Sequence, residues 1–206
     1  MITLYGSATS PNVLKVRNMM LAAGIAFEEH RVKREEGENK SPEFLEISAN
    51  GTLPAIVDDE TGARVFESSA ILLYLGDRSG KFYPVDPARR ADVMKWLIFE
   101  AANISPAIES VYKLYYFEGD WIAQAIEFHK KKLASSISVV DQRLEQARFL
   151  ADECSIADFA LFPVTILLED FLEQPLSDFP GLLSWSERMQ DVINANSESK
   201  GAVKDP

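Results

Sequence analysis

The sequence predicts an α/β domain at the N-terminus and an all-α domain behind it. The first 79 residues alternate short apolar strands with helical patterns, and their opening strand–helix–strand order is typical of a βαβ unit. Residues 80–87 contain a glycine and two prolines, a composition typical of a linker. From there on, apolar residues recur at helical spacing. We therefore expect one domain over residues 1–79 and a helical domain over residues 88–206.

The first elements follow from local signals. Residues 2–5 (Ile-Thr-Leu-Tyr) predict a strand. Pro11 is well placed as an early helical residue, with Ser10 before it in the N-cap region. Gly24 is a suitable C-terminal stop for this helix. Residues 27–32 predict the second strand, so strand, helix and strand follow one another at βαβ spacing.

A hairpin and a helix complete the N-terminal domain. A charged, irregular stretch comes first, and Ser41 with its following proline opens a short helix with Phe44 and Ile47 as apolar positions. Residues 55–57 then predict a short apolar strand. The polar turn Asp-Asp-Glu-Thr-Gly separates it from a second strand at residues 64–66, and an apolar helix follows directly.

The clearest helical segment of the second domain runs from about residue 120 to residue 147. Its apolar residues keep one face at steps of three, four and seven; they are Ile122, Ile126, Leu133, Ile137, Val140 and Leu144. His129 lies on the same face, and we expect a core or boundary residue there. Further on, Ser155 and Asp158 fit a capping box that starts a buried helix. Cys154, just before it, is expected to be structural.

Composition excludes several classes of function. A net charge of −11 disfavours nucleic acid and anionic membranes as partners. No apolar run is long enough to cross a membrane, and no secretory signal is visible. One cysteine rules out an internal disulfide framework, and neither His30 nor His129 has metal-site spacing. We expect a cytoplasmic protein without a metal, whose last residues, from 196 on, fray.

The strand-to-helix corner at Glu67 and Ser68 indicates a binding site. An acid and a serine stand directly before an apolar helix, so one carboxylate and the first helix amides point at the same spot. Helix amides and a serine hydroxyl receive an anion, and the acid receives a cation. This combination suits the head of an amino acid or of a γ-glutamyl peptide.

Four motifs in the right order resemble the glutathione S-transferases. They are the segment from Tyr5 to Val13, the Leu53-Pro54 step before a strand, the Glu67-Ser68 pair and the Ser155–Asp158 box. The resemblance covers nearly the whole chain. It implies a thioredoxin-like N-terminal domain, an all-α C-terminal helical domain, a detoxification role and a homodimer whose interface uses the third and fourth helices.

The resemblance also implies where glutathione, the co-substrate, binds. Glu67 and Ser68 match the γ-glutamyl clamp, the Leu53 backbone matches the contact with the cysteinyl part, and Pro54 matches the family's cis-proline. Asn39 and Lys40 match two polar residues that hold the glycyl carboxylate, although the phi-type enzymes have a histidine at the first. Thr52 stands where a longer polar residue is common.

Catalysis requires glutathione as its thiolate. A free thiol titrates near ~8.5, and lowering its pKa by about two units takes about 2.7 kcal/mol. One or two donors at a helix N-terminus are of the right size. Tyr5, Ser7 and Thr9 are candidate hydroxyls, but the serine-type, phi-like pattern puts the catalytic serine at Ser10. The triplet from Ser10 to Asn12 also resembles nu-type bacterial enzymes, in which an asparagine near the sulfur accompanies disulfide reduction.

A hydrophobic electrophile is the expected second substrate of a transferase. Its pocket would lie between the N-terminal site and the first long helix, and its candidate residues are Asn103, Pro106, Ala107, Tyr112 and Tyr115. Two alternatives stay open. One is a glutathione-dependent disulfide reductase or peroxidase, and the other is a non-catalytic glutathione-binding module on the same fold.

Overall fold

The computed structural model describes residues 1–173 and 175–197. The chain divides into two compact units, one formed by Met1–Pro84 with the described residues from Gln190 on, the other by the described residues of Val85–Met189. The division after residue 84 falls inside the expected linker, and the domain limits drawn from the sequence stay a prediction. The fraying expected from residue 196 on falls almost wholly outside the described residues.

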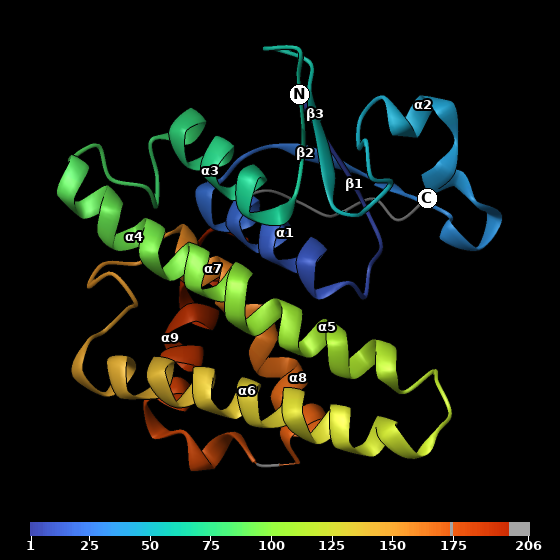
Figure 1. The fold of residues 1–206 in the computed structure, drawn as a ribbon. Coiled ribbons are helices and arrows are strands. Elements are labelled where there is room, and N and C mark those ends of the chain that lie inside the picture. The colour runs from blue at the N-terminus through green and yellow to red at the C-terminus, as the bar shows by residue number, and fades with distance from the viewer. Residues whose placement is uncertain (174, 198–206) are drawn as a thin grey trace. The chain divides into compact units, whose positions relative to one another are not determined.

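A four-stranded sheet forms the centre of the first unit (Figure 1). Its strands are β1 (Ile2–Gly6), β2 (Phe27–Arg31), β3 (Ala55–Asp58) and β4 (Ala63–Phe66), in the order β2-β1-β3-β4. β1 is parallel to β2 and antiparallel to β3, and β3 is antiparallel to β4. This mixed sheet, with the helices below, is the thioredoxin-like arrangement expected from the sequence.

Two helices, α1 (Pro11–Ala23) and α3 (Ser68–Ser79), pack against each other on one face of the sheet (Figure 1). β1 turns Ile2, Leu4 and Gly6 to this face. A Cβ on Gly6 would lie 2.7 Å from Cγ1 of Val13, so only glycine permits this approach of β1 to α1. The ends of α1 are as predicted: Pro11 is its first residue, and Gly24 ends it in the left-handed conformation.

The opposite face of the sheet carries a smaller apolar cluster under the short helix α2 (Pro42–Leu45). Phe44 is buried there with Val32 and Ala55, and Tyr5 packs against them. The Ser41 hydroxyl caps α2 by accepting a hydrogen bond from the Phe44 amide (3.2 Å). α2 is shorter than predicted because it ends at Leu45, which leaves Ile47 beyond it.

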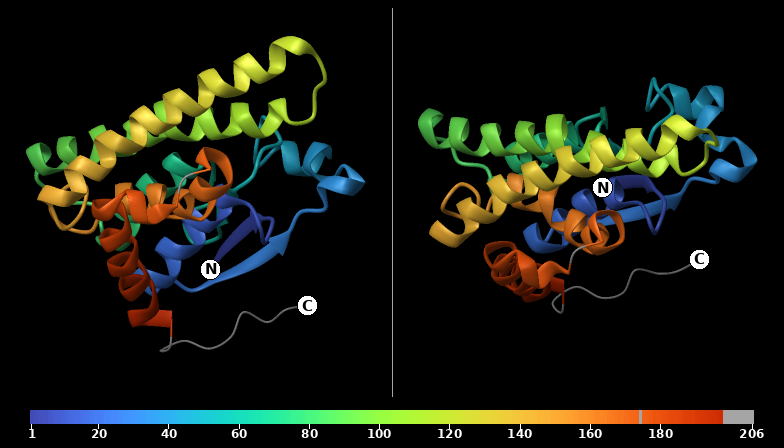
Figure 2. Two further views of the ribbon diagram at one scale, coloured as in Figure 1. Left: turned by 90° about the horizontal axis from the view of Figure 1, so that it is seen from below. Right: turned by 60° about the horizontal axis from the view of Figure 1, so that its bottom comes forward.

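The second unit is helical, which confirms the predicted fold class. It contains α4 (Pro87–Phe99), α5 (Ser105–Leu114), α6 (Asp120–Gln146), α7 (Ile156–Leu161), α8 (Thr165–Leu172) and the first half of α9 (Pro180–Ser197). A π-helical segment, Glu100–Ile104, joins α4 to α5. α5 and α6 run side by side in both views of Figure 2.

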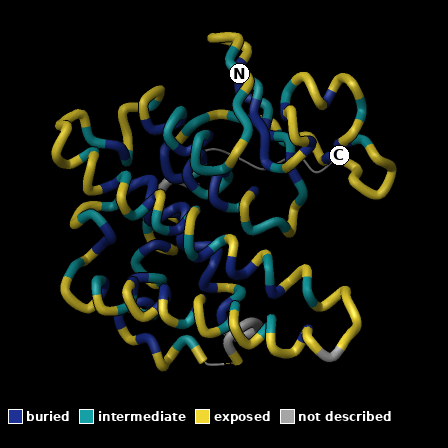
Figure 3. The backbone as a smooth tube through the Cα atoms, in the orientation of Figure 1, coloured by how far each residue is buried: buried dark blue, intermediate teal, exposed yellow. Residues whose placement is uncertain are grey.

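The second unit has its own core. The predicted stripe of α6 is buried at Leu133 (0% exposed) and Ile137 (0% exposed), and α7 is buried along its length, as Figure 3 shows in dark blue. The capping box at the start of α7 is confirmed: the Asp158 carboxylate accepts hydrogen bonds from the Ser155 amide and hydroxyl, at 2.9 and 3.0 Å. Asp158 thus starts a buried helix, as the sequence predicted.

Candidate functional site

Three chain segments meet at one edge of the sheet in the first unit. Tyr5 of β1 lies opposite Ala55 of β3, and Ala55 lies opposite Phe66 of β4. Because of this register, the loop that leaves β1 toward Ser10, the turn that enters β3 and the corner that leaves β4 share this edge. The register therefore brings together motifs that are up to about sixty residues apart in the sequence.

A fourth segment reaches the same edge after β2. β2 runs parallel to β1, and the Val32 amide donates to the Gly6 carbonyl (3.0 Å). The turn that follows lies on the loop before β3, because the buried Asn39 amide group donates to the Gly51 carbonyl (2.9 Å). Gly51 has φ +63°, and a Cβ there would lie 2.4 Å from the Asn39 carbonyl oxygen, so this contact requires glycine.

Lys40 and Thr52 flank this contact between the two loops. The Lys40 ammonium donates to the Asn50 carbonyl (2.9 Å), and its side chain is exposed. The Ser48 hydroxyl holds the Thr52 backbone by donating to its carbonyl (3.0 Å). Thr52 is exposed as well, so both Lys40 and Thr52 face solvent, while Asn39 braces the loop.

Ser10 lies at the N-terminal end of α1, which we call the mouth of the helix. Its carbonyl accepts from the amides of Val13 and Leu14, both at 3.0 Å, as an N-cap residue's carbonyl does. Its hydroxyl makes no capping hydrogen bond with the described helix amides, and the described first turn of α1 holds no acidic residue. The hydroxyl is thus available as a donor beside a helix N-terminus whose partial positive charge favours an anion. Asn12, one residue into the helix, is exposed.

The loop that carries Ser10 has a brace that sequence reasoning missed. Arg17 of α1 holds Glu29 of β2 with two hydrogen bonds, at 2.5 and 2.6 Å. The same guanidinium reaches the Ala8 carbonyl at 3.4 Å. Neither residue belongs to a recognisable motif, since the pair joins positions twelve apart on different elements.

The corner at Glu67 is strained. Glu67 has φ +69° and ψ +118°, a backbone conformation that residues other than glycine rarely adopt. Its side chain is exposed and makes no capping bond with the described amides of α3, and the described first turn of α3 contains no acid. An unused carboxylate and a helix N-terminus therefore stand side by side, with Ser68 as the first residue of α3. Such strain is found at functional sites.

The Leu53-Pro54 peptide bond is cis, as predicted. Pro54 is buried and Leu53 is half-buried against the Phe44 cluster.

Comparison with known proteins identifies the family. The glutathione S-transferase N-terminal domain model matches residues 9–78, and the C-terminal domain model matches residues 123–188. The disulfide-bond oxidoreductase YfcG of Escherichia coli is 31% identical over 197 residues, with 92% of this chain and 90% of that protein covered. The chain belongs to the glutathione S-transferase family.

Two further relatives of this glutathione S-transferase family member are named as transferases, whereas YfcG is named as a disulfide-bond oxidoreductase. Glutathione S-transferase GstB of Escherichia coli is 31% identical over 170 residues, covering 79% of this chain and 81% of GstB. A glutathione transferase from Pseudomonas putida, solved with one glutathione disulfide bound per subunit, superposes with a TM-score of 0.83 at 30% identity. That match covers 97% of this chain and 92% of the other.

The predicted electrophile residues of this transferase-family chain all lie in the second unit. Pro106 is exposed and Ala107 is buried (1% exposed), while Asn103 donates to the Phe99 carbonyl at 3.2 Å within the π-helical segment. Tyr112 and Tyr115 are exposed at the end of α5. Their role in binding stays a prediction.

Sequence reasoning named only part of an aromatic surface around the turn between α5 and α6. The large exposed aromatic residues there are Tyr112, Tyr115, Tyr116, Phe117, Trp121 and Phe128. The Tyr112 and Tyr116 rings lie edge to face at 5.3 Å, and their hydroxyls are 2.8 Å apart. The run of aromatic residues in the sequence is the signal that could have indicated this surface.

Cys154 and the remaining acids do not indicate a second reactive centre. Burial raises the pKa of the Cys154 thiol, and the nearby Asp158 carboxylate raises it further, so the thiol stays protonated. Within residues 1–173 and 175–197, no group of three or more His, Cys, Asp or Glu could hold a metal ion. The described helices also include none with the length and apolar character to cross a membrane.

His129→Gln should leave catalysis nearly unchanged. His129 is half-buried on α6 and packs edge to face on Phe128 at 5.3 Å. The substitution keeps a polar group of similar size there, so we expect lower stability at most, with kcat/KM per folded molecule within a few-fold of wild type. Steady-state kinetics with glutathione measures this. A loss beyond about a hundredfold with normal glutathione binding would show that His129 acts in catalysis, since one donor to a transition state has that effect.

Proposed function

We propose that this protein binds glutathione along the shared edge of the sheet and ionises its thiol at the mouth of α1, for transfer to a hydrophobic electrophile. The observation that carries this proposal is the Ser10 hydroxyl, which makes no capping bond with the described amides although it stands where an N-cap hydroxyl would. The same sheet edge carries the strained Glu67 corner. The Glu67 corner thus matches the γ-glutamyl end of the peptide, and the Ser10 hydroxyl matches its thiol.

The proposed binding mode pairs each charged group of glutathione with a side chain of opposite charge or with helix amides. The Glu67 carboxylate receives the γ-glutamyl ammonium, and Ser68 with the α3 amides receives its carboxylate. The Leu53 backbone pairs with the cysteinyl part. Lys40 holds the glycyl carboxylate, because its ammonium has three donors and the Asn50 carbonyl takes one. Asn39 acts mainly through the loop it braces, with Thr52 beside it.

The proposed chemistry is nucleophilic attack by the glutathione thiolate. The Ser10 hydroxyl donates a hydrogen bond to the sulfur, which favours the thiolate and lowers the thiol pKa, and the thiol proton leaves to solvent water. The helix N-terminus adds to this preference. The sulfur then attacks an electrophilic carbon, forms a C–S bond and expels the leaving group with its bonding electrons. Neither Ser10 nor Asn12 needs to be a base or a nucleophile in this scheme.

A second candidate is reduction of disulfides by glutathione. It is favoured by the triplet Ser10, Pro11 and Asn12, and by the name of the relative YfcG as a disulfide-bond oxidoreductase. In this reaction the bound thiolate attacks one sulfur of a disulfide and releases the other as a thiolate, which takes up a proton from water. A second glutathione then resolves the mixed disulfide, so that two glutathiones become one glutathione disulfide. Asn12 would donate to the sulfur beside Ser10.

One experiment separates the two reactions. Purified protein is assayed side by side with an aryl halide, a mixed disulfide and an organic hydroperoxide, each with glutathione. Turnover of the aryl halide above the rates of the other two supports transfer. Turnover of the disulfide or the hydroperoxide alone moves the assignment to glutathione-dependent reduction. Glutathione binding without turnover of any of them contradicts both and leaves a binding module.

The family resemblance also supports proposals for the partners and the location of the protein. We propose a homodimer in the cytoplasm, with glutathione and the electrophile as small-molecule partners. Sedimentation equilibrium decides between monomer and dimer.

Glu67→Ala should weaken glutathione binding by about 1–3 kcal/mol, the range for a lost charged hydrogen bond. The physical reason is the ammonium, which would lose its only assigned carboxylate. Isothermal titration calorimetry measures the change. Glu46→Ala is the matched control, because Glu46 is an exposed acid of the same unit whose partner is the exposed Arg64. Equal affinity of folded wild type and Glu67→Ala would contradict the γ-glutamyl assignment.

A further inference from the structure

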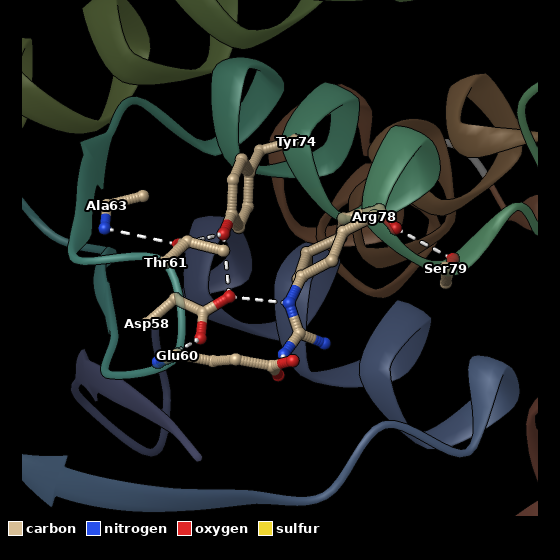
Figure 4. Close-up of polar contacts among 8 residues, drawn as sticks. Asp58, Glu60, Thr61, Ala63, Tyr74, Arg78 and Ser79 are labelled. Atoms are coloured by element: carbon tan, nitrogen blue, oxygen red, sulfur yellow. Dashed lines mark hydrogen bonds and ion pairs between the residues drawn. The ribbon is translucent and has the colours of Figure 1, made fainter.

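A buried carboxylate links the end of β3 to α3. Asp58 is fully buried (0% exposed) at the last position of β3. It accepts hydrogen bonds from the Tyr74 hydroxyl at 2.6 Å and from the Glu60 amide at 3.1 Å, and it pairs with Nε of Arg78 at 2.5 Å. Figure 4 shows both α3 side chains pointing down onto this carboxylate.

The hairpin turn adds a second layer of contacts to the same helix. The Thr61 and Tyr74 hydroxyls lie 2.7 Å apart, and Nη2 of Arg78 donates to Glu60 at 2.6 Å (Figure 4). We call the contacts of Asp58, Tyr74 and Arg78 with the turn the α3 clamp. Tyr74 and Arg78 are four residues apart, so they project from one face of α3.

The clamp is charged at neutral pH. Burial opposes ionisation of Asp58, but the Tyr74 hydroxyl, the Glu60 amide and the Arg78 guanidinium together hold the pKa of its carboxyl below its ordinary value. A buried ionised carboxylate that accepts hydrogen bonds from several fixed donors tolerates little displacement, because a broken contact leaves a charge desolvated. The clamp therefore holds α3 rigidly against the end of β3.

The clamp closes a loop around the strained corner. β4 pairs with β3 up to Phe66, opposite Ala55, and α3 starts two residues later at Ser68. Asp58 holds α3 at Tyr74, six residues and about 9 Å along the helix from Ser68. Glu67 is thus fixed from both sides. A residue held at positive φ persists only where the surrounding structure over-determines it.

We infer that Asp58, Tyr74 and Arg78 are positioning residues: the α3 clamp sets the direction of the helix mouth at Glu67 and Ser68 that receives the γ-glutamyl group. This inference rests on the proposed function for the identity of the ligand. It differs from plain stabilisation, because a cluster that only stabilised the unit would not couple to Glu67. The proposed binding mode includes none of the three clamp residues, so they would act through α3.

Tyr74→Phe tests the inference, because it removes one hydroxyl and keeps the ring. We expect the hydrogen exchange of amides 68–71 to accelerate and glutathione affinity to fall about two- to tenfold, the range for one net hydrogen bond. Asp58→Asn should act in the same direction and more strongly. Arg64→Gln, which removes an exposed pair from β4, is the matched control and should change neither measurement.

A double-mutant cycle separates positioning from stability. If the clamp works through the corner, the effect of Tyr74→Phe on affinity should shrink to near zero in the Glu67→Ala background. Independent, additive effects with unchanged exchange at 68–71 overturn the inference, even if the melting temperature falls. Hydrogen exchange is measured without a ligand. If wild type binds no glutathione while exchange at 68–71 still depends on the clamp, only the proposed function is overturned.

Discussion

Ser10→Ala should lower the rate at neutral pH by about ten- to a thousandfold, the range expected for one donor to a developing or stabilised anion. The hydroxyl is the group at the α1 mouth that would stabilise the thiolate, so its loss raises the pKa of the bound thiol. Affinity should change little, since the γ-glutamyl and glycyl ends keep their contacts. Part of the rate should return as the pH rises, because the free thiol ionises near ~8.5 without help.

Thiolate absorbance in the far ultraviolet, titrated against pH in wild type and Ser10→Ala, measures the shift directly. Thr9→Ala, which removes an exposed hydroxyl from the same loop, is titrated beside it, because Thr9 is also a candidate donor. Coincident titration curves for wild type and Ser10→Ala would reduce Ser10 to a loop residue. Asn12→Ala is then the next variant, and a large effect there favours the disulfide-reductase reaction.

Asp158→Ala should destabilise the protein by about 4 kcal/mol or more, because four buried hydrogen-bond donors lose their acceptor. Asp158 is fully buried and accepts hydrogen bonds from the Leu150 amide at 3.0 Å and the Trp185 indole at 2.9 Å, besides its two bonds to Ser155. Removing the carboxylate leaves these buried donors unsatisfied, at about 1–3 kcal/mol each. Denaturant unfolding followed by circular dichroism gives the loss in free energy of unfolding.

Asp152→Asn is the control for this prediction. Asp152 is an exposed acid near the same helix, paired with Arg143 at 2.7 Å. Exposed pairs contribute about 0–1 kcal/mol, so the control should unfold close to wild type. Similar unfolding free energies for Asp158→Ala and Asp152→Asn would show that the box is dispensable. The catalytic constants per folded molecule should not change in either variant, because neither residue belongs to the proposed site.

The sequence by itself determined most of the elements and several of their ends, although not the end of α2. Pro11 and Gly24 bound α1, the stripe through Leu133 and Ile137 is the buried face of α6, and Asp158 completes a capping box. These are local effects: caps, turns and periodic burial depend on residues within about one to two helical turns of one another. Motifs of the same short range also led to the proposed roles of Ser10 and of the Glu67 corner.

Only the tertiary structure decided how these pieces meet. The register of Tyr5 with Ala55 and of Ala55 with Phe66 sets the shared edge, and no single motif encodes it. The structure alone shows that Asn39 braces a loop through Gly51. The α3 clamp could not be predicted for the same reason. In the sequence Asp58 is one more polar residue of a turn, and its hydrogen bond with Tyr74 joins residues sixteen positions apart. Contacts between distant residues depend on packing and strand register, which local propensities do not specify.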